Sequence, residues 1–337
     1  MFSDLQKYLA SPAQHVNLMM HYCRIVLYTT VAIIMATGCV PKDPFPPEQH
    51  YASSSINVPF IPPRSELCGS TSIEMVASYW QSQTNFSPKL STQELDARTL
   101  IPAKGGTLQI EMVIAARSNG LIAYPLDATY EALFSELYAH HPVIVLVNRG
   151  FSWHPLWHYA PVIGYDEEKR SIVAHFSDQP NEALSIGTFS ALWKRSGNWG
   201  VVLLPPEELP ASVSPKTFLR AVYEFEKSGN AEEVIVAYQS GLRRWPDNPD
   251  LLFALANASY NASRWIEAEE NYRKLLALNP SHPLALNNLA MVLCRSHRSD
   301  EALILLDKVV SDDIKIQSII KATREEILSG CIPLPKK

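Results

Sequence analysis

Residues 66–80 read ELCGSTSIEMVASYW and place Cys68 directly before a glycine, small polar residues and an amphipathic run. The apolar residues of this run, from Ile73 to Trp80, predict a helix over 69–81 with Cys68 at its N-terminus. Unpaired N–H groups and the positive end of a helix dipole favour a thiolate over a thiol. The stretch therefore predicts a nucleophilic cysteine, although a buried structural cysteine fits the same pattern.

The chain around this helix, 57–206, mixes helical and strand patterns. Two further runs, 107–118 and 128–139, carry apolar residues at helical spacing. Short β-rich runs stand between and after them: LIAYPL, then 142–148, 158–165, 171–176 and 199–205. Because the helices come first and the strands follow in succession, we expect an α+β domain with a largely antiparallel sheet.

A histidine and a carboxylate follow the predicted helix. His158 starts the β-rich part of WHYAPVIGYD (157–166), and the charged run 166–170 predicts the turn of a hairpin over 158–176. Folding about this turn brings residues 177 and 178 opposite His158, so Asp178 would lie beside the imidazole. A carboxylate in that place orients the ring and stabilises the imidazolium, as in a catalytic triad. Each residue alone also fits a structural role, His158 in the core and Asp178 in a turn.

Three stretches together resemble a known family. They are VPFIPPRSELCGSTSIEMVASYW, WHYAPVIGYD, and FSDQP followed by SIGTFSALW, and they resemble the papain-like peptidases that remove double-glycine leaders from bacteriocins. The resemblance implies that Cys68 is the nucleophile, His158 the general base and Asp178 the orienting acid. More closely, the arrangement resembles bacterial lipoproteins that join a cysteine peptidase domain to C-terminal tetratricopeptide repeats.

The chain departs from the family pattern at two places near the cysteine. The family usually has a glutamine five or six residues before the cysteine, and its amide helps to bind the oxyanion. This chain has Pro62 and Pro63 there, and Gly69-Ser70 where Gly-Pro is usual. Losing one oxyanion donor lowers the rate by about 100- to 1000-fold. The backbone N–H of Cys68 remains as a donor.

From about residue 214 the sequence repeats every 34 residues, as Glu233, Glu267 and Glu301 illustrate. This period is typical of tetratricopeptide repeats, in which each helical hairpin covers the apolar stripe of its neighbour. We expect copies at 214–247, 248–281 and 282–315 and a capping helix at 316–329, within an all-α domain spanning 214–330. A linker at 207–213 separates it from the first domain.

The repeats predict a surface that binds a protein partner or substrate. Stacked helical hairpins form a concave groove. The polar candidates for that groove are Asn257, Asn287, Asn288 and Lys274, although helix residues of this kind commonly face solvent.

The first forty residues carry the pattern of a targeting segment. Residues 25–38 form an uncharged run of signal-peptide length that ends in small residues before Cys39. This resembles a bacterial lipoprotein box, which implies a signal peptide at 1–38, a lipid on Cys39 and a tether at 39–56. Val40 replaces the aspartate of inner-membrane retention, so we expect the outer membrane, facing the periplasm. An uncleaved N-terminal anchor is the alternative.

Composition and residue spacing argue against several other kinds of functional site. The 337 residues allow about two domains, and a net charge of −5 without basic blocks argues against a nucleic-acid surface. Five cysteines without a CxxC pair exclude a zinc ribbon or a dithiol site. His154 and His158 stand four apart like a metal pair on a helix, but Pro155 and the strand pattern oppose a helix. We therefore predict no metal and no cofactor.

The sequence leaves three functions open. The first is a lipid-anchored cysteine peptidase acting through Cys68, His158 and Asp178. The second is a catalytically weak or inactive papain-like scaffold of the cell envelope, and the third is an acyltransferase in which an amine replaces water.

Cys294 lies in an apolar helical stretch, which favours a buried free thiol over a disulfide with Cys331.

Overall fold

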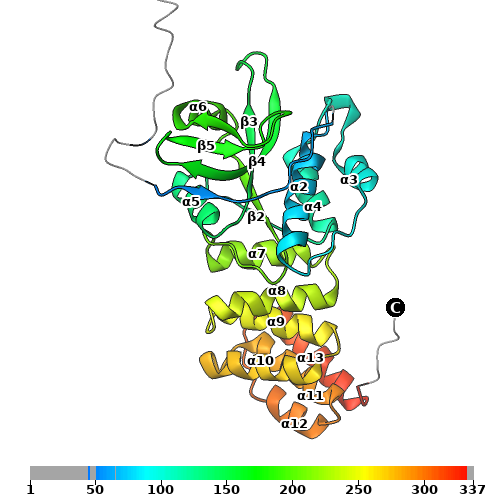
Figure 1. Ribbon diagram of the computed structural model, residues 1–337. Helices are drawn as coiled ribbons and strands as arrows, with labels where there is room; N and C mark the ends of the chain where they lie inside the picture. The colour runs from blue at the N-terminus through cyan, green and yellow to red at the C-terminus, as the bar shows by residue number, and fades with distance from the viewer. Residues whose placement is uncertain (1–44, 46–50, 65, 332–337) are drawn as a thin grey trace, which may run out of the picture.

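The computed structural model describes residues 45, 51–64 and 66–331. The predicted signal peptide, Cys39 and most of the predicted tether lie outside the described residues. Within them, no helix combines the length and apolarity needed to cross a bilayer. The chain forms an α+β domain followed by a stack of helices (Figure 1).

A seven-stranded sheet is the centre of the first domain, and every pair of neighbouring strands is antiparallel. The strands are β1 (Ser54–Ser55), β2 (Ile122–Pro125), β3 (Val143–Asn148), β4 (Trp157–Asp166), β5 (Ser171–Ala174), β6 (Glu182–Ser185) and β7 (Gly200–Leu204). Their order is β2-β7-β3-β4-β5-β6, and β1 pairs with the end of β4. The antiparallel α+β prediction is confirmed.

Helices cover both sides of this sheet. They are α2 (Cys68–Gln83), α3 (Thr92–Thr99), α4 (Gln109–Ser118), α5 (Tyr130–Tyr138) and α6 (Ile186–Lys194). In Figure 1, α2, α3 and α4 gather at one side and α5 and α6 at the other. Ile73 and Val76 of α2 are fully buried, and the Trp80 indole N–H donates to the Leu203 carbonyl at 2.8 Å. These contacts fix the middle and the C-terminal part of α2 against the sheet.

Each predicted repeat copy holds one helical hairpin. The pairs are α7 (Pro215–Phe225) with α8 (Ala231–Arg244), α9 (Pro249–Asn261) with α10 (Trp265–Leu278), and α11 (Pro283–Arg295) with α12 (Ser299–Leu306), followed by α13 (Ile314–Leu328). A proline opens the first helix of every pair, at 215, 249 and 283, where its missing N–H costs no helical hydrogen bond. The 34-residue period is therefore a period of helix starts.

The first domain shares one hydrophobic core with α7, α8 and part of α9, and the later repeat helices pack around a second core. Phe218 of α7 stacks on Tyr124 of β2 with ring centroids 5.7 Å apart, and both side chains are fully buried. The predicted linker is also held, because the buried Glu136 carboxylate accepts hydrogen bonds from the N–H groups of Ala211 and Ser212 at 3.1 and 2.7 Å. The first repeat is thus packed onto the sheet rather than tethered to it.

Cys294 and Cys331 form a disulfide with Cα atoms 6.0 Å apart. The expectation of a free Cys294 is therefore wrong. Periodicity placed Cys294 inside a buried helix face correctly, but α13 packs back onto α11 and brings the following turn over it. The bridge closes the end of the repeat array.

Candidate active site

Cys68 is the first residue of α2, and its side chain is half-buried. The preceding residue, Leu67, supplies no side-chain cap, so first-turn N–H groups remain open to an anion. Burial nevertheless raises the pKa of the Cys68 thiol, and the backbone N–H groups of Tyr159, Cys68 and Gly69 offset this only in part. The resting side chain is a neutral thiol at pH 7. The helix dipole, from which we expected a thiolate, is outweighed by desolvation.

Gly69 and Thr107 meet beside the sulfur. A Cβ atom on Gly69 would lie 2.6 Å from the Thr107 hydroxyl oxygen, so only glycine fits here. That hydroxyl is buried and has no hydrogen-bond partner among the described residues. A buried donor without an acceptor costs free energy unless a ligand supplies one. The sequence pattern did not single out Thr107, because it predicted this residue as the start of the helical run 107–118, whereas α4 begins at Gln109.

His158 lies on β4 opposite Val147 of β3 and reaches the same cleft as Cys68. The cleft has a volume of about 660 Å³ and is lined by residues of four segments: Pro63, Arg64, Glu66, Cys68, 104–108 and 155–159. Burial and the charge of Arg149 lower the pKa of His158 to about 4, whereas Glu182 acts in the opposite direction. The imidazole is therefore neutral at pH 7, which is the form that accepts a proton.

A second histidine, His175, lies near the Cys68 sulfur, but both of its ring nitrogens already make hydrogen bonds. Its Nε2 donates to the Val58 carbonyl at 3.1 Å, and its Nδ1 accepts from the Asn181 N–H at 3.2 Å. The ring of His158, by contrast, makes no hydrogen bond with any residue that the structure describes, Cys68 included. His158 is consequently the imidazole free to meet the thiol, and catalytic hydrogen bonds are commonly formed only when substrate binds.

Asp178 does not continue the predicted hairpin. Strand β5 ends at Ala174 and the chain bends at 177–179, which leaves Asp178 exposed. Within the described part of the chain, its carboxylate makes no hydrogen bond or ion pair with His158. Glu182, the first residue of β6, carries the negative charge that acts on His158, and its Oε2 is buried without a described partner. The role of Asp178 stays a prediction.

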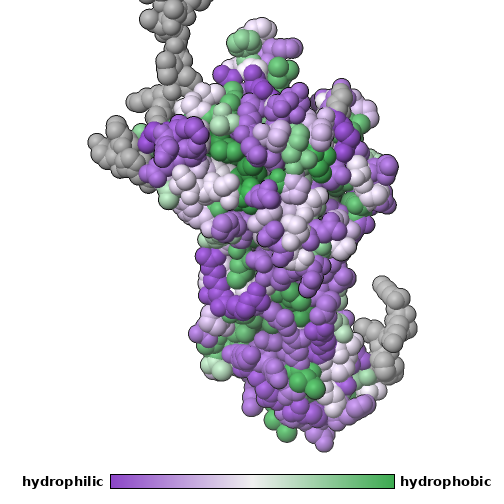
Figure 2. Space-filling view, viewed as in Figure 1, coloured by the Kyte–Doolittle hydropathy of each residue, from purple (hydrophilic) through white to green (hydrophobic). Residues whose placement is uncertain are grey.

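The loop between β3 and β4 forms an aromatic rim beside the cleft. Phe151, Trp153 and Trp157 are 63%, 82% and 50% exposed, and the first two rings stack with centroids 5.4 Å apart. The Asn148 side-chain oxygen accepts from the N–H groups at 150 and 156, both at 2.9 Å, so the loop is held in shape. Figure 2 shows hydrophobic residues at the outer tip of this domain.

Residues 52–193 match the family model of the papain-like cysteine protease AvrRpt2. This segment is a papain-like cysteine protease domain. Residues 249–282 and 271–304 match models of the tetratricopeptide repeat. The predicted combination of a papain-like domain with C-terminal repeats is confirmed.

Individual relatives cover only parts of the chain. The cellulose synthase operon protein C of Pseudomonas fluorescens (strain SBW25) is 42% identical over 64 residues, which are 19% of this chain and 5% of that protein. The first repeat domain of Spaghetti (RPAP3) bound to an HSP90 peptide has a TM-score of 0.30, 19% identity, and coverage of 34% of this chain and 93% of its own. The Yersinia enterocolitica chaperone SycD with a YopD peptide has a TM-score of 0.32, 12% identity, and coverage of 34% and 92%.

The four polar residues expected in the repeat groove differ in access. Asn257 lines a groove of about 480 Å³ between α7 and α9, but its side-chain oxygen already accepts from Tyr272 and from Asn288. Asn287 is buried and donates to Asn288 at 3.1 Å. Lys274 is exposed on α10. Asn257 and Asn288 thus join α9 to α11, and the binding of a partner by these residues stays a prediction.

Proposed function

We propose that the protein is a lipid-anchored periplasmic cysteine peptidase. The observation that carries the proposal is that Cys68, at the start of α2, and His158, on β4, line one cleft within the papain-like domain. A half-buried imidazole without a described hydrogen bond, in the same cleft as a helix-terminal thiol, matches a nucleophile and its base. The repeats would hold the substrate or a partner protein.

The charge states suggest a general-base mechanism. The thiol of Cys68 and the ring of His158 are both neutral at pH 7, because burial disfavours either charge. In this mechanism His158 takes the thiol proton as sulfur bonds to the peptide carbonyl. The imidazolium then gives that proton to the leaving amine as the C–N bond breaks. Water, deprotonated by the neutral ring, cleaves the thioester and regenerates the thiol.

The oxyanion requires donors in place of the absent glutamine. The N–H groups of Cys68 and Gly69 approach the sulfur, since both lower its pKa. The Thr107 hydroxyl lies against Gly69 and is buried without a described acceptor. We assign these three groups to the oxyanion, where preorganised donors stabilise developing charge.

Two carboxylates compete for the role of orienting acid. The family resemblance assigns it to Asp178, while the electrostatics of the described conformation favour Glu182. Glu182→Gln and Asp178→Asn are matched isosteric tests. The orienting acid is the one whose amide variant lowers the turnover by orders of magnitude with KM little changed.

The substrate is expected to carry an apolar side chain next to the scissile bond. Leu156 and Trp157 line the cleft and are 57% and 50% exposed, and the stacked pair of Phe151 and Trp153 extends this surface outward. Asn148 holds the loop, so little ordering entropy is lost on binding. Aromatic side chains supply large contact area at such sites.

The envelope location has one supporting structural feature. The Cys294–Cys331 disulfide is typical of an oxidising compartment such as the periplasm. The lipid on Cys39 and the outer membrane remain part of the proposal. Cys39→Ser protein that still partitions into membranes and still carries an acyl mass would contradict the lipid assignment.

A covalent probe tests the catalytic proposal directly. The full chain is incubated with a peptidyl vinyl sulfone whose residue next to the warhead is leucine, and the adduct is located by peptide mass mapping. We expect labelling of Cys68, lost in His158→Ala and in Cys68→Ser, with His140→Ala as the matched histidine control. The peptidase proposal would be overturned if the vinyl sulfone labelled Cys68 no faster in the parent protein than in His158→Ala.

A scaffold function is the second candidate. It is favoured by Pro63 at the cleft where the family usually has its glutamine nearby, and by the raised pKa of the Cys68 thiol. It predicts that Cys68→Ser leaves every cellular phenotype of the parent unchanged. If the protein is a peptidase, this single-atom change should reproduce the phenotype of cells that lack the protein.

A further inference from the structure

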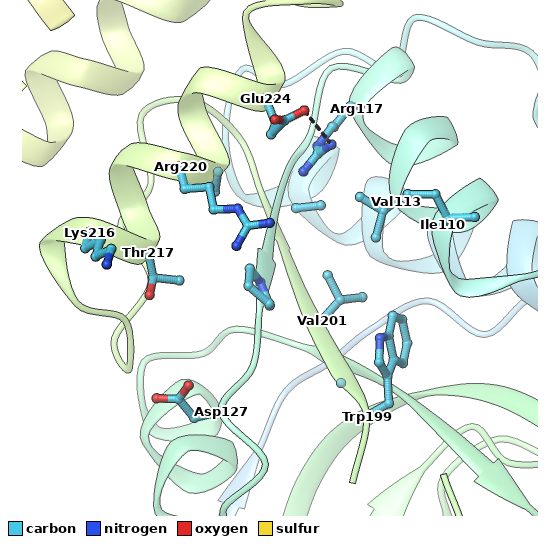
Figure 3. Close-up of a pocket in the computed structure, with 14 residues that line it drawn as sticks. Ile110, Val113, Arg117, Asp127, Trp199, Val201, Lys216, Thr217, Arg220 and Glu224 are labelled. Atoms are coloured by element: carbon cyan, nitrogen blue, oxygen red, sulfur yellow. Dashed lines mark ion pairs between the residues drawn. The ribbon is translucent and has the colours of Figure 1, made fainter. Parts of the chain in front are cut away.

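A pocket of about 590 Å³ lies at the junction of the two domains, apart from the cleft of Cys68. Its walls come from α4, from β2 and β7 of the sheet, and from α7 of the first repeat (Figure 3). The stacked pair of Phe218 and Tyr124 fixes α7 on β2, so the walls are held without a ligand. We call this space the junction pocket.

Two arginines line the junction pocket, and their positive charges are not fully balanced by acidic partners. Arg117 of α4 lies 3.9 Å from Glu224, whose closer partner is Lys227 at 2.7 Å. The Arg117 Nε is buried and has no hydrogen-bond partner among the described residues. Arg220 of α7 makes no hydrogen bond or ion pair with any residue of the described ranges. In Figure 3 both guanidinium groups reach into the space between their helices.

The two guanidinium groups repel each other. Burial lowers the pKa of Arg117, and the charge of Arg220 lowers it further against the opposing effect of Glu224. The other acid of the pocket, Asp127, lies at the opposite end in Figure 3. An anion between Arg117 and Arg220 would relieve this repulsion and supply the missing acceptor for Nε.

The remaining wall is apolar. Val113, Val201 and Trp199 line it on the side away from Arg220, and Ile110 at 56% exposure forms part of the rim. A small inorganic anion would leave this surface uncovered. A ligand that joins a charged end to an apolar body matches both halves of the pocket.

We propose that the junction pocket binds a carboxylate carried by an apolar group. The planar carboxylate suits two guanidinium forks, each donating parallel N–H bonds. The apolar group would cover Val113, Val201 and Trp199. Two sources share this chemistry, a small free acid and the C-terminal residue of a peptide.

The second source has a route into the pocket. Lys216 and Arg220 line both the junction pocket and the repeat groove between α7 and α9. A peptide lying in that groove could therefore end with its C-terminal residue in the junction pocket. The proposal does not depend on the chemistry of Cys68.

The experiment is calorimetric titration of the full chain with three probes. They are hexanoate, the peptide GGSGL with a free C-terminal carboxylate, and the same peptide as its amide. Arg220→Gln is the principal variant, because Arg220 has no described partner whose loss would unfold the chain. Lys308→Gln removes an exposed cation from the far end of the repeats and is the matched control. Unfolding temperatures verify that both variants fold.

We expect hexanoate, the free peptide acid or both to bind, and Arg220→Gln to weaken that binding about tenfold or more. Lys308→Gln should bind like the parent. Binding of hexanoate alone assigns a small-acid site, and binding of the peptide acid assigns a peptide terminus. The proposal is overturned if neither acid binds at about 10 mM, if the amide binds as well as the acid, or if Arg220→Gln binds unchanged.

Discussion

The indole of Trp199 packs edge-on against the ring of Tyr159, with centroids 5.6 Å apart and planes at 75°. Tyr159 lines the cleft of Cys68, and its N–H is one of the groups that stabilise the thiolate. Trp199 lines the junction pocket. One aromatic contact therefore separates the candidate active site from the space beside the first repeat.

The pH dependence of Cys68 alkylation should follow a raised thiol pKa. Because burial raises that pKa, the thiolate fraction at pH 7 is smaller than in a free cysteine, and the rate should rise above pH 9. Iodoacetamide rates at Cys68, followed by peptide mapping, measure this. His158→Ala should leave the pH midpoint of this rise nearly unchanged, because the neutral ring adds no charge beside the sulfur, even though it removes the base that assists the reaction. A plateau below pH 7 would instead reveal a thiolate–imidazolium pair.

The ring of His158 should titrate far below an ordinary histidine. Burial and Arg149 lower its pKa to about 4, so Arg149→Gln should raise the value and Glu182→Gln should lower it. NMR titration of the imidazole protons measures all three proteins. Asp178→Asn distinguishes the two carboxylates: a drop in the pKa as large as that of Glu182→Gln would show that Asp178 also faces the ring.

Gly69→Ala should damage the start of α2. Its new Cβ would lie 2.6 Å from the Thr107 hydroxyl oxygen, and overpacking of this kind costs about 1–3 kcal/mol of the free energy of unfolding. Urea unfolding measures the loss. Gly106→Ala is the matched control, because its new Cβ would have no described atom within 4 Å beyond the two neighbouring residues. Equal stability of the two variants would refute the close contact.

Glu136→Gln should destabilise the whole chain. The carboxylate is fully buried, lies 2.6 Å from His141 and accepts from the backbone of the linker. Removing one partner of such a buried pair costs about 3–5 kcal/mol. Despite burial, the bonds from His141 and Ser212 lower the pKa of Glu136. Its contribution is therefore present above the pKa of the unfolded carboxyl and is lost as pH falls through the folded value.

Acid and neutral unfolding experiments together test this assignment. The parent should lose stability between about pH 5 and the lower folded pKa, whereas Glu136→Gln should lose less over the same interval. Glu168→Gln, on an exposed turn, is the matched control and should unfold like the parent at each pH. A Glu136→Gln protein with the acid sensitivity of the parent would contradict the role of Glu136.

Local patterns in the sequence determined the elements that carry the site. The run from Ile73 to Trp80 predicts α2 beginning at the cysteine, and the 34-residue period predicts the helix pairs, because both signals depend on neighbours within a few turns of chain. The strand pattern placed His158 on β4 for the same reason. An element that buries one face repeats apolar residues at short intervals, so its pattern is visible in the sequence.

Contacts between distant parts of the chain set which groups meet. The end of β5 at Ala174 left Asp178 exposed and brought the charge of Glu182 to bear on His158. Burial set the direction of the Cys68 pKa against the helix dipole, and the return of α13 paired Cys294 with Cys331. These outcomes depend on desolvation and on contacts between residues far apart in the chain, and neither is encoded in a local pattern.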